Sequence, residues 1–519
     1  MAQELSYRSP DDSAHLYHVG TLTYTKAALA VLFFWLIWGD VCYTLMESVT
    51  GPIMLLKFQA LHASNTEMAL LVSTIPTCVY SFFNPVISFR SDRFRSRFGR
   101  RIPFILLSLP FLVLGLIGLA FGDQLGFWIH ARLHLSRIPP NQLAMWTLGI
   151  LLVTFTFFNT FVTTTFWYLF NDVVPEVLLA RFMSWFRVFG TLSASLYTFF
   201  VFPYSGTHAT AIFMGAALLY LVGFGLMCLN VREGQYPPPP PNTGGGTGPI
   251  SIIRTFGKEC HSNRIYWYLW LCTFIGSIGS GVALFDLYFK QAIGLSLFQI
   301  SDINGTNLIV VSVLIVGAGW LADRYHPIRV VLLSQVLSWV LLTPATMIWI
   351  FWHPSPTEQW TFRLSFLHHL PYVHALSVLH IQKSFLISLV IYVGLTAPLN
   401  SLGAMWDPVL LMRTFPRSRL GQFCSINAVW RSVGGMLGGF LAGGYLDIVS
   451  HRVGKEHAYF YCPIWSVCFG IPAFIFFVKF YQAWKRHGGD DYVAPLPVAV
   501  PNPAFPVTLL NEAEAEVAP

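Results

Sequence analysis

Two acidic residues in the first long apolar run of the sequence are the clearest candidates for chemistry. Asp40 and Glu47 are separated by seven positions, with Tyr43 and Thr44 between them. In a helix this spacing makes about two turns, so the two acids share one face. A charge inside an apolar membrane helix costs about 2.5–3.5 kcal/mol, so each acid needs a reason to be there. Because a carboxyl group in such surroundings can take up and release a proton near neutral pH, we interpret the two as a proton-binding pair. The alternative is that one of them only pairs with a buried arginine and holds helices together.

Two arginines also fall inside apolar runs. Arg187 follows Arg181 by six positions, which puts it about 9 Å into its run if the run is helical. Arg431 lies deeper in a later run, near Asn427. A guanidinium group offers a planar fork that matches carboxylates and hydroxyl groups. We predict that Arg187 contacts a solute or is the partner of Asp40, and that Arg431 contacts a solute. A purely structural ion pair is the alternative for both.

Two asparagines and one ion pair complete the polar residues of interest. Asn159 and Asn400 fall at corresponding places in the two halves of the chain. Amides are good partners for sugar hydroxyl groups, although they can equally bond neighbouring helices. Asp286 and Lys290 are four residues apart at the end of an apolar run, and a local pair at a helix end explains both charges.

No pattern in the sequence predicts a metal site, a cofactor or an enzyme. The cysteines form no CxxC pair, and there is no phosphate-binding glycine loop, HExxH or GxSxG motif. Five histidines gather in the connection at 353–380, where a pH sensor or a metal site is possible. Their spacing repeats no metal-ligand template, so a solvated amphipathic loop is the favoured interpretation. Nothing resembles a basic, aromatic-rich surface for nucleic acid.

The composition identifies the elements that must position these residues. The chain has 519 residues, of which 55% are hydrophobic and 11% are charged, and its mean hydropathy is +0.58. This excludes a soluble protein and a disordered one, and it predicts an all-α polytopic membrane protein. Twelve apolar segments can be distinguished, at 27–56, 67–89, 102–122, 143–170, 182–204, 207–230, 265–289, 298–321, 328–351, 384–411, 422–447 and 460–482. We expect Gly51 and Pro52 to break the first of them near its end.

The distribution of positive charge predicts the orientation in the membrane. Of the 31 Lys and Arg residues, 21 fall in the termini and the even-numbered connections and only eight in the odd-numbered ones. Positive residues are enriched on the cytoplasmic side, so both termini are expected there, in the cell (plasma or inner) membrane. The strongest contribution is the segment RSDRFRSRFGRR at residues 90–101.

The chain is also predicted to divide into two similar halves. Three short patterns recur in the same order at a nearly constant offset, for example Ser91-Asp92-Arg93 and Ala322-Asp323-Arg324. Such a repeat indicates a duplicated six-helix unit, and many secondary transporters are built from duplicated halves with a binding site between them. The expected organisation is an N-terminal segment, a first bundle, a Pro/Gly-rich linker, a second bundle and a disordered tail, at 1–26, 27–230, 231–264, 265–484 and 485–519.

These features resemble the major facilitator superfamily. The segments Asn84–Arg93 and Ser96–Ile105 are similar to the cytoplasmic signature of the glycoside–pentoside–hexuronide symporters, and within them to the sucrose/proton branch. Gly319–Arg324 resembles the second copy of that signature. The resemblance to the superfamily covers roughly residues 27–482. It implies a two-bundle transporter that moves sugars together with protons or sodium by alternating access.

The resemblance also assigns roles to individual residues. Asp40 resembles the sugar-binding acid of the melibiose-type symporters, Trp167 matches a family tryptophan, and Arg187 matches a family arginine. A second sugar-binding acid of the family falls on Thr163 here. The acids that serve sodium in those relatives correspond to Tyr80 and Asn84, which favours protons over sodium. The predicted proton-coupling residues are Asp40 and Glu47, and the predicted substrate-binding residues are Asp40, Tyr43, Asn159, Thr163, Trp167, Arg187, Asn400 and Arg431.

Two Asp-Arg pairs are predicted to control switching between conformations. Asp92-Arg93 and Asp323-Arg324 begin equivalent connections on the predicted cytoplasmic side. An aspartate there can pair with an arginine or with a helix N-terminus of the other bundle, and can so latch the two bundles together. The alternative, that these residues only mark topology, explains the arginines but not the aspartates.

Three classes of function remain open on these grounds. Proton-coupled import of a sugar by a monomer is the leading one. Transport of another organic solute, such as a cell-wall fragment or a drug, in either direction is the second. A non-transporting membrane receptor is the least favoured, because a static receptor needs no paired motifs for rocking. A panel of solutes would separate the first two.

Overall fold

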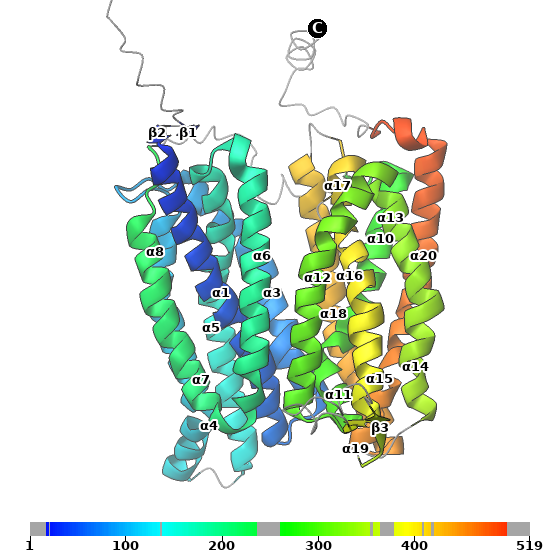
Figure 1. The fold of residues 1–519 in the computed structure, drawn as a ribbon. Coiled ribbons are helices and arrows are strands. Elements are labelled where there is room, and N and C mark those ends of the chain that lie inside the picture. The colour runs from blue at the N-terminus through cyan, green and yellow to red at the C-terminus, as the bar shows by residue number, and fades with distance from the viewer. Residues whose placement is uncertain are drawn as a thin grey trace, which may run out of the picture.

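The computed structural model describes residues 17–19, 21–134, 137–235, 260–352, 357–363, 378–406, 409–416 and 420–495. Within this part the chain is almost entirely helical. The helices from Lys26 to Asn230 form one bundle, and those from Arg264 to Arg486 form a second bundle beside it (Figure 1). The short β1–β2 hairpin and the last described residues lie at the same end of the molecule, which we call the hairpin end. The opposite end, where α19 lies, is called the α19 end.

Six long helical segments make up the described first half. They are preceded by a two-stranded antiparallel hairpin. The elements are β1 (Tyr17–Val19), β2 (Leu22–Tyr24), α1 (Lys26–Ala60), α2 (Asn65–Ala69), η1 (Leu70–Thr74), α3 (Ile75–Arg93), α4 (Ile102–Leu133), α5 (Pro140–Val173), α6 (Glu176–Phe200), η2 (Phe202–Tyr204), α7 (Ser205–Leu219), η3 (Tyr220–Phe224) and α8 (Gly225–Asn230). The elements α2, η1 and α3 form one segment, and so do η2 to α8.

The described second half repeats this plan with more interruptions. Several of its segments contain π-helical or 3-10 turns, which are common at functional positions in helices. The elements are α10 (Arg264–Gly279), η4 (Ser280–Phe285), α11 (Asp286–Ala292), α12 (Leu297–Tyr325), α13 (Pro327–Leu337), η5 (Ser338–Leu342), α14 (Thr343–Phe351), β3 (Gln359–Arg363), β4 (Val378–Gln382), α15 (Lys383–Leu389), η8 (Val390–Thr396), α16 (Ala397–Gly403), η9 (Ala404–Trp406), α17 (Val409–Thr414), α18 (Leu420–Val453), α19 (Lys455–Ala458), η11 (Tyr459–Tyr461), α20 (Cys462–Arg486) and η12 (Gly489–Asp491).

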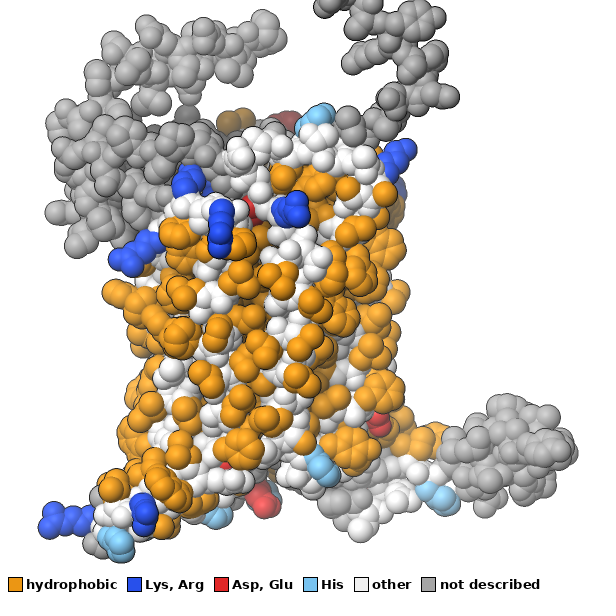
Figure 2. Space-filling view, turned by 90° about the vertical axis from the view of Figure 1, so that its left-hand side faces the viewer, with side chains coloured by type: hydrophobic (Ala, Val, Ile, Leu, Met, Phe, Trp, Pro, Cys, Tyr) orange, Lys and Arg blue, Asp and Glu red, His pale blue; other side chains and the backbone are white. Residues whose placement is uncertain are grey.

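Eleven helical segments in the described chain are long and apolar enough to cross a membrane. The segment that is not among them is α6, which carries Arg187 and several hydroxyl side chains and packs between α1 of its own half and α12 of the other. Figure 2 shows hydrophobic side chains over the middle of one face, with the charged side chains toward its two ends. This is the surface that a protein surrounded by lipid requires.

Two details of the helices differ from expectation. The first helix, α1, runs unbroken through Pro52. Proline removes one backbone hydrogen bond, but a long packed membrane helix tolerates the loss. The helix α4 continues about three turns beyond the predicted segment at 102–122 and ends at Leu133. The additional turns contain Asp123, Gln124, His130 and Arg132, so hydropathy alone does not reveal them.

The beginning of the predicted linker is part of the first bundle. The carboxylate of Glu233 accepts hydrogen bonds from the backbone N–H groups of Arg100, Arg101 and Ile102, at 2.8, 2.8 and 2.7 Å. These groups lie at the N-terminus of α4, where a negative charge is favourable. Gly99, with a φ of +102°, lets the chain pass directly over Glu233. The rest of the linker, residues 236–259, lies outside the described residues.

Replacement of Glu233 by alanine is expected to destabilise this junction. Three N–H groups at the start of α4 would lose their acceptor, which costs about 1–2 kcal/mol for a helix cap. Thermal unfolding of the purified protein in detergent measures the loss as a lower melting temperature. Glu456→Ala, which removes an exposed glutamate from α19, is the matched control. An equal effect of the two replacements would contradict the capping role.

The first residues of the predicted disordered tail, 485–495, belong to the described second half. The helix α20 continues to Arg486, and the following residues pack on the second bundle. Asp490 forms a salt bridge of 2.8 Å with Arg329, and the Tyr492 hydroxyl donates to the carbonyl oxygen of Thr414 at 3.2 Å. Polar contacts of this kind do not show in a hydropathy pattern. Residues 496–519 lie outside the described part of the chain.

Hydrogen bonds between the two halves concentrate toward the α19 end. The carboxylate of Asp447 in α18 accepts from the backbone N–H groups of Asn65 and Thr66, both at 2.9 Å, and from the Thr66 hydroxyl at 2.5 Å. The Tyr459 hydroxyl donates to Asn65 Oδ1 at 2.8 Å. The Tyr288 hydroxyl donates to the carbonyl of Leu55 at 2.6 Å. Asp447 therefore caps the start of α2 across the bundle interface and fastens the halves together at this end.

Candidate functional site

The polar face of α1 carries the predicted acids. Asp40 is only 4% exposed, and its Oδ1 atom has a long contact of 3.5 Å with the Thr44 hydroxyl. The other oxygen, Oδ2, is buried and has no hydrogen-bond partner. Gly190 of α6 covers it so closely that a Cβ atom there would come within 2.7 Å of Oδ2. Asp40 is thus enclosed by two helices and has few polar partners.

Arg187 and Trp167 lie next to this carboxyl group. The guanidinium group of Arg187 lies over the Trp167 ring, 5.8 Å from its centroid, in the range of a cation–π contact. The positive charge of Arg187 acts electrostatically on Asp40, but the two form no salt bridge within 4.0 Å. Arg187 is exposed and Trp167 is half-buried. Arg187 and Asp40 therefore form no direct ion pair, and their partnership stays a prediction.

Hydrogen bonds tie the rest of the α1 face to α5. The Tyr43 hydroxyl and the Thr163 hydroxyl are 2.9 Å apart, and Asn159 Nδ2 donates to Glu47 Oε1 at 2.5 Å. The Glu47 side chain is exposed although it lies far from both ends of the helix. An exposed charge at this depth must line an aqueous space, because lipid does not solvate a carboxylate. The predicted residues of the first half therefore come together on α1, α5 and α6.

The two predicted residues of the second half line a separate wall. Asn400 and Arg431 are both exposed and border a cavity of about 560 Å³ within the second bundle. Gln335, Ser277 and Trp406 border it as well. Amide, hydroxyl, guanidinium and indole groups are a set that can bind a polar organic molecule.

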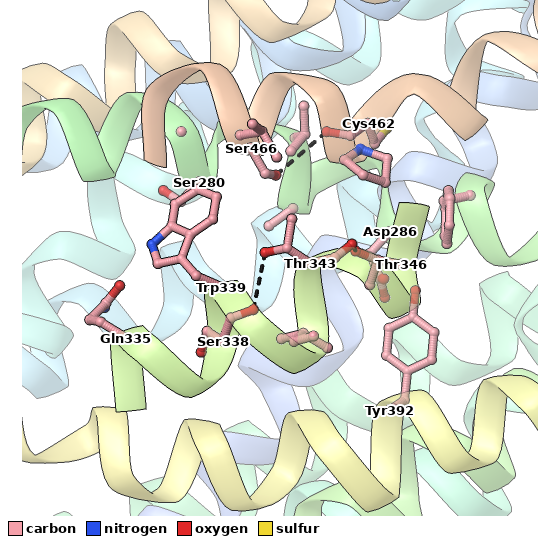
Figure 3. Close-up of a pocket in the computed structure, with 17 residues that line it drawn as sticks. Ser280, Asp286, Gln335, Ser338, Trp339, Thr343, Thr346, Tyr392, Cys462 and Ser466 are labelled. Carbon is pink, nitrogen blue, oxygen red and sulfur yellow. Dashed lines mark hydrogen bonds between the residues drawn. The ribbon is translucent and has the colours of Figure 1, made fainter. Parts of the chain in front are cut away.

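Sequence reasoning missed the importance of Asp286 and Lys290. The Lys290 side chain is 3% exposed, and its ammonium group contacts Asp286 Oδ2 at 2.6 Å and Asn304 Oδ1 at 2.7 Å. It also lies 4.0 Å from the centre of the Tyr392 ring. The Asp286 side chain is 41% exposed and borders two cavities. Figure 3 shows one of them, within the second bundle, with Asp286 and Tyr392 on the same side of it. The interpretation as a local pair at a helix end was incomplete, because Lys290 is buried among three helical segments. The polar residues Asn304 and Asn307 in an apolar run were the signal.

The predicted switch residues are only partly described. The side chains of Asp92, Arg93 and Asp323 lie outside the described residues, so the cytoplasmic latch stays a prediction. Arg324 is exposed and packs over Trp320, 5.4 Å from its ring centroid.

The loop that follows Arg93 is held by an acid that the sequence did not single out. Both Arg100 and Arg101 form salt bridges with Asp172 at the end of α5.

No cluster of three or more His, Cys, Asp or Glu side chains that could hold a metal occurs among the described residues. Of the predicted histidine group only His380 is described, and its Nδ1 atom lies 3.1 Å from the Thr361 hydroxyl.

Comparison with solved structures identifies the fold. A variant of the nucleoside transporter NupG has a TM-score of 0.56 at 11% identity, covering 87% of this chain and 100% of its own. A D-xylose–proton symporter has a TM-score of 0.56 at 14% identity, covering 87% and 97%. A bacterial homologue of the human lysosomal transporter Spinster, in an inward-facing and unoccupied conformation, has a TM-score of 0.56 at 14% identity, covering 88% and 97%. At these identities the likeness shows the fold alone, and it confirms the predicted all-α polytopic architecture.

A family model assigns the sequence. Among curated proteins no relative matches the chain. The model of the family described as MFS/sugar transport protein matches residues 35–480, which is most of the chain. The match identifies the family but no branch within it, so the resemblance to the sucrose/proton symporters stays a prediction. The two-bundle fold, the polar faces turned to the bundle interior and the match over residues 35–480 lead to one conclusion: the chain belongs to the MFS/sugar transport protein family of the major facilitator superfamily and is a multi-pass secondary transporter.

Proposed function

We propose that this protein carries a sugar or glycoside across the membrane together with a proton, by alternating access between its two bundles. The observation that carries the proposal is the environment of Asp40. One carboxyl oxygen has a single long contact and the other has none. A neutral, protonated carboxyl group needs fewer partners in such a place than a carboxylate does. Asp40 is therefore suited to hold a proton during part of a transport cycle.

A proton is favoured over sodium as the coupled ion. At the positions that would hold sodium by resemblance, Tyr80 is partly exposed and Asn84 accepts a hydrogen bond from the Thr164 hydroxyl at 2.6 Å. A hard cation prefers several oxygen ligands that include carboxylates. Asn84 supplies a neutral oxygen that is already used to join α3 and α5, so these residues offer a poor sodium site.

The polar and aromatic groups near Asp40 in the first bundle are suited to bind a sugar. Trp167 offers an aromatic face, and Arg187, Asn159 and Thr163 offer hydrogen-bonding groups from two helices. Sugars bind through such combinations of a flat apolar surface and precisely placed polar groups. The family description and one structural neighbour, the D-xylose–proton symporter, point to the same class of solute.

The nearby charge of Arg187, which forms no ion pair with Asp40, offers a way to link the transport of solute and proton. A solute that bonds to Arg187 would draw its charge away from Asp40 and so favour protonation of the acid. By reciprocity, protonation of Asp40 would favour solute binding.

The halves are fastened at the α19 end, and we place the hairpin end in the cytoplasm because of the Lys/Arg asymmetry. The α19 end, which these contacts close, is then the extracellular end.

Uptake into proteoliposomes tests the proposal. We expect one of sucrose, D-xylose and uridine to accumulate when an inward proton gradient is imposed, and we expect sodium at constant pH to have no effect. A gradient of one pH unit can support roughly tenfold accumulation if one proton moves with each solute. Liposomes without protein are the control for leak. Accumulation driven by sodium alone would contradict proton coupling, and accumulation of uridine but neither sugar would contradict the solute class.

A further inference from the structure

A polar cavity lies between the two bundles, apart from the Asp40 region. This interface pocket has a volume of about 430 Å³ and is bounded by α1, α6, η2, η4, α11 and α12. Two contacts close to it join the halves: the Ser195 hydroxyl donates to the Gly305 carbonyl at 3.0 Å, and Tyr288 contacts Leu55 as described above. The interface pocket therefore lies just inside the fastened α19 end. Its polar lining residues are Ser48, Tyr197, Thr198, Asp286, Asn304 and Asn307.

The charges at the interface pocket cancel. The Asp286 carboxylate borders the pocket, and the buried ammonium group of Lys290 is fixed against it. Because Lys290 also takes Asn304 Oδ1, the Nδ2 group of Asn304 is left to donate to another partner. The pocket thus offers a carboxylate acceptor and an amide donor without a net charge. This arrangement suits a neutral molecule with several hydroxyl groups and disfavours a free cation, which Lys290 would repel.

One hydroxyl group at the interface pocket has no partner within the protein. Tyr197 is 5% exposed and lines the pocket, and its hydroxyl oxygen is buried without a hydrogen bond. A buried polar group without a partner costs free energy that a phenylalanine would avoid. A small turn of the Tyr197 side chain would bring this hydroxyl to the surface of the pocket, where an occupant with a hydroxyl group would supply the missing hydrogen bond.

We propose that the interface pocket is a solute subsite that binds a hydroxyl-rich neutral group, through Asp286, Asn304 and Tyr197. The inference deepens the proposed function, since it rests on the solute being a sugar or another polyol. When the contacts at the α19 end open, this pocket becomes accessible to a solute from that side. A sugar and the ribose of a nucleoside share the required neighbouring hydroxyl groups, so both are used as probes.

Replacement of Tyr197 by phenylalanine tests the subsite. The probes are sucrose, D-xylose and uridine, added to the detergent-purified protein without any ion gradient, and binding is measured as a rise in melting temperature. The concentration of the best probe needed for half of the maximal rise should increase about fivefold to tenfold in Tyr197→Phe, since one hydrogen bond is lost. The melting temperature without a probe should not fall, because the hydroxyl has no partner in the empty protein.

Tyr220→Phe is the matched control. Tyr220 is also a buried tyrosine with an unpartnered hydroxyl, but it does not line this pocket. The Tyr220→Phe protein should have the same half-maximal concentration of the best probe as the unmodified protein. A second variant, Asp286→Asn with Lys290→Met, removes both charges together and should weaken binding at least tenfold.

Two outcomes would overturn the subsite. One is an unchanged half-maximal concentration in Tyr197→Phe, and the other is the absence of any stabilisation by the three probes up to roughly 100 mM. Because the assay uses no gradient, it is independent of proton coupling. Uptake that depends on a proton gradient, together with unchanged binding in Tyr197→Phe, would leave the proposed function intact and remove only this subsite.

Discussion

Asparagine in place of Asp40 is expected to abolish accumulation driven by a proton gradient while leaving solute exchange across the membrane intact. The amide has nearly the shape of a protonated carboxyl group but cannot gain or lose a proton in this pH range. Accumulation should fall from roughly tenfold per pH unit to equilibration. The two activities are measured with the same proteoliposomes, as uptake of labelled sugar under a pH gradient and as exchange against internal unlabelled sugar.

The matched control for this replacement is Asp123→Asn. Asp123 forms a salt bridge of 3.1 Å with Lys57 near the α19 end of α4, away from the Asp40 face. This variant should retain both accumulation and exchange. Accumulation that persists in Asp40→Asn, or that is lost equally in both variants, would remove Asp40 from the coupling mechanism.

Asparagine in place of Asp447 is expected to open the α19 end. In the structure this carboxylate accepts three hydrogen bonds from the first two residues of α2 in the other half. Charge-assisted bonds at a helix N-terminus are stronger than neutral ones. Weakening them by about 2–3 kcal/mol would shift the equilibrium between closed and open α19 ends by roughly 30-fold to 150-fold.

Labelling of a cysteine at the interface pocket measures this shift. Ser48→Cys places a thiol inside the closed end, in a background where the exposed Cys78 and Cys468 are replaced by serine. An impermeant thiol reagent applied from the α19 side should label it much faster when Asp447 is asparagine. Asp490→Asn, which breaks a salt bridge within the second half, should leave the rate unchanged. Equal rates in all three proteins would show that Asp447 does not fasten the halves.

The sequence alone was sufficient to predict the helices and most of the residues on the polar face of the first bundle. Long apolar runs leave little choice of structure in a membrane, and a charge inside such a run stands out by its cost. This is why Asp40, Glu47 and Arg187 could be named in advance. Their neighbours Trp167 and Thr163 followed from the resemblance to a known family, and the structure shows the contacts that join them to Arg187 and Tyr43.

The features that could not be predicted depend on segments that meet across the fold. Asp447 and the start of α2 are far apart in the chain, and neither sequence is unusual by itself. Lys290 has a satisfactory local partner in Asp286, so the sequence does not require the burial against Asn304 and Tyr392 that the structure shows, and the asparagines in the next apolar run are its only signal. The acceptor role of Glu233 at the start of α4 is hidden for the same reason, since a polar residue in a polar linker carries no signal.

Movement of protons with the solute tests the central claim most directly. A pH-sensitive dye is enclosed in weakly buffered proteoliposomes without any imposed gradient, and sucrose, D-xylose or uridine is added outside. If solute and proton cross together, the interior should acidify on addition of the transported solute, and Asp40→Asn should show solute entry without acidification. Entry of the solute into liposomes of the unmodified protein with no change in internal pH would contradict the account.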